Sequence, residues 1–125
     1  MTGPVDTALF DAETLDKAAD HIDTYRWWQG GFSPWHQRKD PKAACCAGGA
    51  INVVLVGSPG GPPVWTLAVE RPYRALIAHL DLDALADEEV AETVGRWNDH
   101  PDRTAEEVTA ALRACAERLR GGWRP

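Results

Sequence analysis

The feature that most restricts the fold is an amphipathic pattern near the C-terminus, in the segment DRTAEEVTAALRACAERLRGG at residues 102–122. Thr104 followed by Glu107 is a capping-box signature, in which each side chain satisfies a backbone N–H at the start of a helix. Apolar residues then recur at helical spacing until two glycines end the pattern. The segment therefore predicts a helix over about 104–120 with one buried face, made of Val108, Ala111, Leu112, Cys115 and Leu119.

Three other segments carry apolar residues at helical spacing. One predicts a helix over about 11–25, with Asp11 or Thr14 near its start as the cap. The segment DEEVAETVGRW at 87–97 predicts a short helix with acidic residues in its first turn. Pro72 predicts the first turn of a further helix, because proline fits that position without losing a hydrogen bond.

Residues 43–69 fit two structures. The Ala-rich start of KAACCAGGAINVVLVG favours a helix, whereas its β-branched end favours a strand. We expect a helix over about 43–54. The alternative is a β-hairpin across 51–69 in which SPGGPP forms the turn.

The length of 125 residues predicts one domain, spanning 1–125, with a core of its own. The predicted fold is mainly α: a compact bundle of about five helices with long Pro/Gly-rich loops, and one small β-hairpin as the open alternative. Residues 1–10 and 121–125 are expected to be flexible termini.

No apolar run reaches the roughly 20 residues that cross a membrane, and no secretory signal is present, so we expect a cytoplasmic protein. Three cysteines, two of them adjacent, are expected to be thiols.

Charge is distributed unevenly along the chain. The net charge is −6, which argues against a nucleic-acid-binding protein because such proteins show a basic footprint. Residues 24–42 carry four cations and one carboxylate, whereas residues 81–107 carry ten carboxylates and two cations. An anionic or aromatic small molecule suits the basic segment better than a phosphate backbone does.

Half of the Phe, Trp and Tyr residues lie in YRWWQGGFSPWHQ, residues 25–37. In one interpretation its tryptophans close the core at the end of the first helix. In the other, the two glycines expose backbone while aromatic and basic side chains line a small-molecule or peptide pocket. The second interpretation proposes Trp28, Trp35, His36 and Arg38 as binding residues.

The pair Cys45-Cys46 also has two interpretations. A thiol near a helix N-terminus can have a lowered pKa and act as a nucleophile, for which His36 would be the base. Alternatively one cysteine packs in the core, and Gly48 with Gly49 allows close helix packing. The structural interpretation is favoured, because no third residue orients the base at a recognisable spacing.

The remaining motifs carry weaker signals. No metal-ligand spacing is present, so the sequence indicates no metal site, and GSPGG lacks the Lys-Ser/Thr pair of a phosphate loop, so it indicates no cofactor. In RWNDHPDRT, Asn98 and Asp99 favour a turn that Pro101 completes. The alternative is a polar set at a helix end in which Asp99 orients the His100 imidazole.

Four motifs follow one another in the order LDKAADHI, WWQGG, CCAGGAI and WNDHPDRTAEEV. In that order they resemble an uncharacterised family of small actinobacterial and phage proteins, with the patterns C-A-x-G-A-I and W-N-D…R-T-x-x-E-V. The resemblance covers most of the chain from Leu15 to Leu119 and makes Cys46 the family cysteine. It implies no activity, and it points to Cys46, Trp97, Asn98 and Asp99 as the residues to test.

We expect a small soluble binding or accessory protein that holds a small molecule or a partner protein in an aromatic, locally basic site. The candidate binding residues are Trp28, Trp35, His36, Arg38, Trp97, Asn98 and Asp99. One alternative is a small cysteine-dependent enzyme with Cys46 as nucleophile and His36 or His100 as base. The other is a phage-type regulator that docks on a host protein through its acidic 81–107 face.

Overall fold

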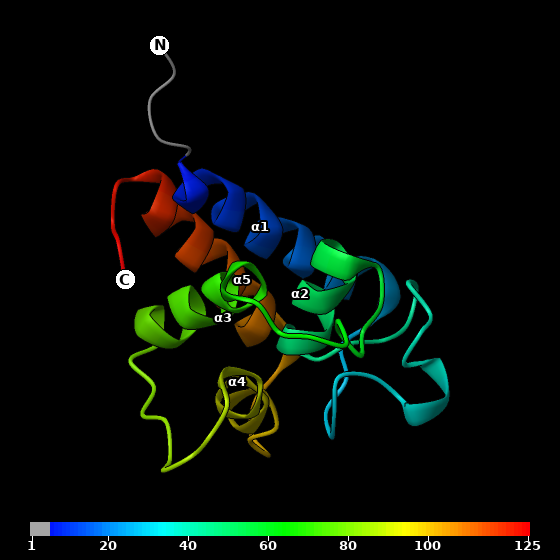
Figure 1. Cartoon of the computed structure of the whole chain (residues 1–125). Helices are drawn as coiled ribbons and strands as arrows, with labels where there is room; N and C mark the ends of the chain where they lie inside the picture. Colours follow the sequence, from blue (N-terminus) through cyan, green and yellow to red (C-terminus); the bar gives the residue numbers. More distant parts are fainter. Residues whose placement is uncertain (1–5) are drawn as a thin grey trace.

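In the computed structural model, which describes residues 6–125, the chain forms five α-helices and one short 3₁₀ helix (Figure 1). They are α1 (Thr7–Tyr25), η1 (Trp35–Gln37), α2 (Ala47–Val56), α3 (Leu67–His79), α4 (Val90–Asn98) and α5 (Ala105–Arg120). The first and last helices run side by side, and α2 packs against α1 next to them. The predicted mainly α bundle is confirmed.

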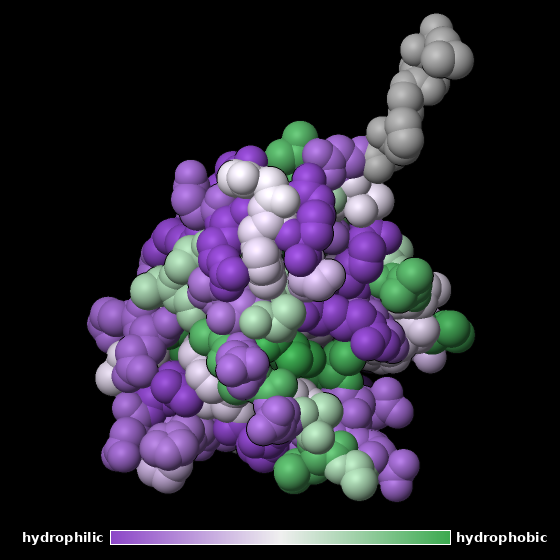
Figure 2. Space-filling view, turned by 90° about the vertical axis from the view of Figure 1, so that its left-hand side faces the viewer, coloured by the Kyte–Doolittle hydropathy of each residue, from purple (hydrophilic) through white to green (hydrophobic). Residues whose placement is uncertain are grey.

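The core is formed by side chains from all five helices. Its largest fully buried members are Tyr73, Leu15, Ile51, Leu76 and Leu112. Figure 2 shows a largely hydrophilic outer face on which hydrophobic side chains gather in a band across the middle. Within residues 6–125, no helix combines the length and the apolarity needed to cross a membrane.

Helix α1 begins at Thr7 rather than near Asp11, because the Asp6 carboxylate caps it by accepting a hydrogen bond from the backbone N–H of Ala8 (3.1 Å). Residues 7–10, expected in a flexible terminus, therefore form the first turn of α1, while residues 1–5 of that terminus lie outside the described residues. Asp11 is not a cap but a buried carboxylate, paired with Arg71 of α3 at 3.1 Å.

Helix α2 begins at Ala47, later than the predicted residue 43. Cys46 is its N-cap, with extended backbone, and its Sγ accepts a hydrogen bond from the N–H of Gly49 (3.3 Å). Residues 41–43 form a turn and a bend, and Cys45 forms an isolated parallel bridge with Trp27. The hairpin alternative is wrong, because the β-branched residues up to Val56 continue the helix, which ends at a left-handed glycine, Gly57.

Helix α3 begins before the predicted position. Thr66 caps it through a hydrogen bond from the N–H of Val69 to its hydroxyl (3.4 Å), so Pro72 lies in the second turn rather than the first. The next residue, Tyr73, is fully buried against α2. Its hydroxyl lies 2.8 Å from the Gly48 carbonyl oxygen and 2.6 Å from Oδ1 of Asn52.

The two C-terminal helices follow their sequence patterns closely. In α5, Thr104 accepts the N–H of Glu107 at 3.2 Å, as the capping box predicts. Beyond α5, residues expected in a flexible terminus make contacts. The Arg118 guanidinium lies 4.0 Å from the ring centre of Trp123, and Arg124 donates to the Leu119 carbonyl oxygen at 3.0 Å.

One close approach brings the loop after α1 against the start of α2. A Cβ atom at Gly49 would lie 2.1 Å from the backbone oxygen of Phe32, so only glycine allows this contact. The N–H of Cys46 donates to the same oxygen at 3.2 Å. The Phe32 backbone is therefore held directly over the N-terminus of α2, and this position shapes the site described below.

Gly49→Ala is expected to lower the free energy of unfolding by about 2–4 kcal/mol, because the added methyl group requires Phe32 or α2 to shift. Urea denaturation of both proteins measures the difference.

Gly95→Ala is the matched control, since a Cβ at Gly95 meets no atom within 4 Å. This helical substitution should raise stability by about 0.4–1 kcal/mol. Equal stability of the wild type and the Gly49 variant would contradict the close approach.

Candidate functional site

The buried side chain of Asn98, the last residue of α4, joins three segments of the chain. Its Oδ1 accepts hydrogen bonds from Nε1 of Trp27 (2.8 Å) and from the backbone N–H of Ala47 (3.0 Å). Its Nδ2 donates to the Trp28 carbonyl oxygen and to Oδ1 of Asp99, both at 3.0 Å. The amide thus uses both its donor and its acceptor groups, as a fully buried polar side chain requires.

The residues after the two tryptophans are tied to the same end of α4. Gln29 donates from Nε2 to the carbonyl oxygens of Asn98 (3.1 Å) and His100 (3.0 Å). The N–H of Gly30 donates to Oδ1 of Asp99 at 3.1 Å. The Trp27 ring packs against the core. Because Trp27, Gln29 and Gly30 all bond to the end of α4, this segment serves mainly to attach the loop to that helix.

The Cys46 thiol has the surroundings of a structural cap. It is 3% exposed, and burial raises its pKa to about 11. Burial likewise raises the pKa of Cys45 and Cys115 to about 12. His36, the proposed base, is exposed on η1 and is not among the residues that line the hollow next to Cys46.

A hollow of about 340 Å³ lies between Gly31 and Phe32, the start of α2 and one face of α4. It is lined by Gly31, Phe32, Cys46, Ala91, Glu92, Gly95, Arg96 and Asp99. A second hollow of about 480 Å³ shares Phe32, Ala91 and Glu92 with the first and extends to Trp65. Together they form what we call the α4 groove, which has apolar walls and a few charged groups.

The charged groups of the α4 groove are not equally available to a ligand. Arg96 is engaged by Glu88, at 3.0 and 3.2 Å, and by the Asp83 carbonyl oxygen at 2.7 Å. The hydrogen bond from Arg96 lowers the pKa of Glu88 to about 2, so this ion pair stays charged at neutral pH. The carboxylates of Glu92 and Asp99 therefore leave the groove with an acidic character.

The residues expected to form one binding site lie in two places. Cys46, Asn98 and Asp99 come together beside the groove, where Trp28 contributes only its backbone oxygen to the network. The exposed residues Trp35, His36 and Arg38 lie instead on and just after η1, and none of them lines the α4 groove.

Trp97 and His100, which the sequence also singled out, make only local contacts. Trp97 is covered by Arg103, whose guanidinium lies 4.4 Å from the ring centre. His100 accepts the N–H of Asp102 through Nδ1 (3.1 Å), while the Asp99 carboxylate is bound to Gly30, which favours the turn interpretation of this segment. Among residues 6–125, no three His, Cys, Asp or Glu side chains gather as metal ligands would.

Sequence reasoning missed most of the groove-lining residues. Phe32 was not among the candidate binding residues, yet it lines both hollows of the groove. The available signal was the small pair Ala91 and Gly95, four residues apart and therefore on one face of α4. Small side chains at that spacing leave room at a helix surface.

Asn98→Ala is expected to lower the free energy of unfolding by about 2–4 kcal/mol, because it leaves the Trp27 indole N–H, the Ala47 N–H and the Trp28 carbonyl without partners. Asp99→Asn keeps an acceptor for Gly30 and should change stability by less than about 0.5 kcal/mol. Thermal or urea unfolding compares the two. Similar losses in both variants would show that the Asn98 network is not the main attachment.

Cys46 is expected to react slowly with iodoacetamide in the native protein. A thiol with a pKa of about 11 is ionised in roughly one molecule in a thousand at pH 8. Peptide mapping by mass spectrometry should show alkylation at least about 100-fold slower than in the urea-denatured chain. Rapid alkylation of Cys46, faster than that of Cys115, would instead support the cysteine-dependent enzyme.

Comparison with known proteins gives one finding. The model of a family of unknown function, DUF6197, matches residues 7–118. No curated protein and no solved structure matches the chain. The family match spans α1 to α4, most of α5 and all residues of the α4 groove. The chain therefore belongs to DUF6197, a family of unknown function.

Proposed function

We propose that this protein is a non-catalytic binding protein that holds a small molecule in the α4 groove. The observation that carries the proposal is the hollow of about 340 Å³ with apolar walls and a few charged groups. Small-molecule sites are typically concave, largely apolar and roughly 300–1,000 Å³ in volume, with few polar groups to orient the ligand. The adjoining hollow next to Trp65 gives the site additional apolar surface.

The walls of the groove favour binding because they are held in place before a ligand arrives. The Asn98 amide fixes the end of α4 to the loop and to α2, and the Gly49 contact fixes Phe32. A preorganised site loses little conformational entropy when it binds. This rigidity supports a binding role for the groove.

The surroundings of Cys46 favour binding over catalysis. A nucleophilic cysteine needs a lowered pKa and a base within hydrogen-bond reach. Burial raises the pKa of Cys46 instead, and its sulfur already accepts the Gly49 N–H. No histidine lines the groove.

The ligand that fits best is an organic amine or guanidine with an apolar portion. The cation would face Glu92 and Asp99, whereas the apolar portion would lie against Phe32 and Ala91. Arg96 does not oppose this, because Glu88 neutralises it. The proposed site is therefore acidic and lies at other residues than the basic and aromatic ones expected from the sequence.

Gly95→Trp should abolish ligand binding without unfolding the protein, because position 95 lines the groove and has open space around its Cβ. A panel of aromatic and alkyl amines would be screened by thermal shift against the wild type. An amine present at about 100 times its Kd stabilises the native state by about 2.7 kcal/mol, which raises the Tm.

Gly95→Ala is the control and should keep the shift, since one methyl group fills little of the groove. Glu92→Gln with Asp99→Asn should weaken binding of the same amines about tenfold or more, while both side chains keep their shape. The proposal fails if no amine raises the Tm of the wild type, or if Gly95→Trp leaves the shift intact.

Three further expectations from the sequence analysis are kept as proposals. The first is that the patterns C-A-x-G-A-I and W-N-D…R-T-x-x-E-V characterise DUF6197, and that its members come from actinobacteria and their phages; an alignment of members would test both. The second is a cytoplasmic location. The third is docking through residues 81–107, where two ion pairs, Arg96–Glu88 and Arg103–Glu107, already offset part of the acidic charge.

A further inference from the structure

The loop that carries η1 displays a tryptophan to solvent. Trp35 is 78% exposed, more than any other large hydrophobic side chain among the described residues. The guanidinium of Arg38 lies 4.6 Å from the centre of its ring. Figure 1 shows this loop projecting from the helices at the right-hand side of the molecule. Tryptophan and arginine are the residues most enriched among those that dominate protein–protein binding.

The same loop is held rigidly by hydrogen bonds. The carbonyl oxygen of Arg38 accepts bonds from the Ser58 hydroxyl (2.9 Å) and from the N–H of Gly60 (3.0 Å). At the other end, His21 of α1 donates from Nε2 to the Ala43 carbonyl oxygen at 2.8 Å. Trp35 is thus presented on a fixed support, which lowers the entropy cost of docking a partner there.

Positive charge that forms no ion pair is concentrated in the segment that carries this tryptophan. Within residues 6–125, eight of the thirteen Lys and Arg side chains form ion pairs. Four of the other five lie between residues 26 and 42: Arg26, Arg38, Lys39 and Lys42. The one carboxylate of that segment, Asp40, accepts the backbone N–H of Lys42 at 2.9 Å. The segment that carries the most exposed aromatic ring therefore also carries four of the five cations that form no ion pair.

We propose that Trp35, His36, Arg38, Lys39 and Lys42, the η1 surface, dock an acidic segment of a partner protein that also carries an apolar side chain for Trp35. All five side chains are exposed, so the surface suits an extended chain better than an enclosed small molecule. A net charge of −6 disfavours a nucleic acid, whose binding needs a broad basic footprint. The η1 surface is separate from the α4 groove, so this proposal does not depend on the proposed function.

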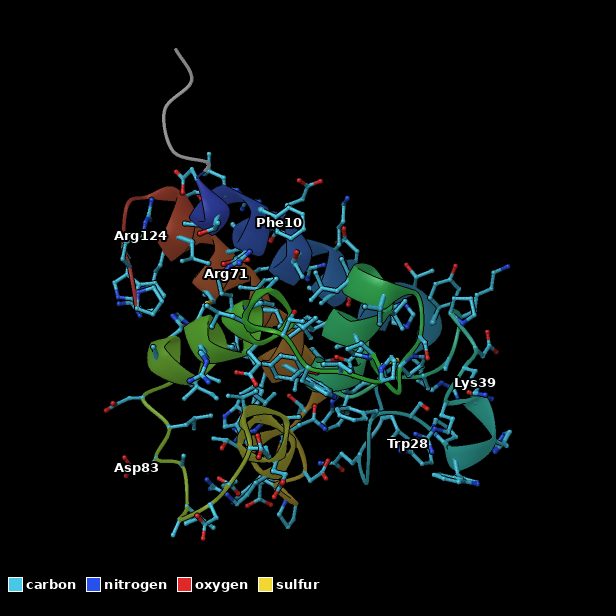
Figure 3. All side chains as sticks on the ribbon, in the orientation of Figure 1. Phe10, Trp28, Lys39, Arg71, Asp83 and Arg124 are labelled. Atoms are coloured by element: carbon cyan, nitrogen blue, oxygen red, sulfur yellow. The ribbon has the colours of Figure 1, made fainter. Side chains whose placement is uncertain are left out.

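The charge distribution of the whole molecule favours one orientation of such a partner. Lys39 lies on the projecting loop, whereas Asp83, in the acidic 81–107 segment, lies on the opposite side of the molecule (Figure 3). An acidic chain is attracted to the first side and repelled by the second. Attraction of this kind raises the association rate and weakens as salt is added.

The proposal is tested by selecting from a yeast-displayed library of random 12-residue peptides against the full-length protein. Enriched peptides are expected to be rich in Asp and Glu and to contain at least one Leu, Phe or Trp. Their affinity, measured by fluorescence anisotropy, should fall about tenfold or more in Trp35→Ala and in the double variant Lys39→Glu with Lys42→Glu. It should also fall several-fold between 50 and 300 mM NaCl.

Matched controls separate this surface from general charge and apolarity. Lys17→Glu reverses an exposed cation on α1, and Val64→Ala removes an exposed apolar side chain elsewhere, so both should leave affinity within about twofold. Enriched peptides that are not acidic, or that bind the η1 variants as well as the wild type, would overturn the proposal. Tighter binding of a single-stranded oligonucleotide than of any selected peptide would overturn it in favour of a nucleic acid.

Discussion

A single buried amide group joins the three segments that surround the α4 groove. The Asn98 side chain satisfies groups on the loop after α1 and at the first residue of α2, while it belongs to α4. These segments are separated by about fifty and seventy residues in sequence, and no other described side chain bonds to both of them. The α4 groove exists because these three segments keep fixed positions relative to one another. A side chain at position 98 that did not make these bonds would leave the Ala47 N–H and the Trp28 carbonyl buried without partners. Each such group costs about 1–3 kcal/mol.

The sequence predicted those parts of the fold that depend on neighbouring residues. The Thr104 cap and the apolar stripe of α5 are local, and the structure confirms both. The start of α1 was misplaced because Asp11, an ordinary cap by type, pairs with Arg71 from another helix. The hairpin alternative arose from β-branched residues whose strand preference is overridden because they continue a helix whose first half is buried and which packs against α1.

The candidate site was only half predictable, for a similar reason. Asn98, Asp99 and Cys46 were identified through a resemblance, although the local sequence favoured only a turn at Asn98-Asp99 and core packing for a cysteine of the Cys45-Cys46 pair. The groove itself depends on a glycine that meets a backbone oxygen from a distant loop, and no sequence pattern records that contact. The aromatic segment has two structural parts: Trp27 attaches the loop to α4, whereas Trp35 faces solvent.

The pairing of the first and last helices has a consequence for synthesis of the chain. Helix α1 leaves the ribosome first, but α5, with which it shares its most extensive contact, is made last. Until residues 105–120 emerge, the face of α1 that meets α5 stays uncovered, and a nascent chain with exposed apolar surface is prone to aggregation. A helical protein of this topology therefore closes its core late, through contacts of large sequence separation, and should fold more slowly than a bundle whose neighbouring helices pair in order.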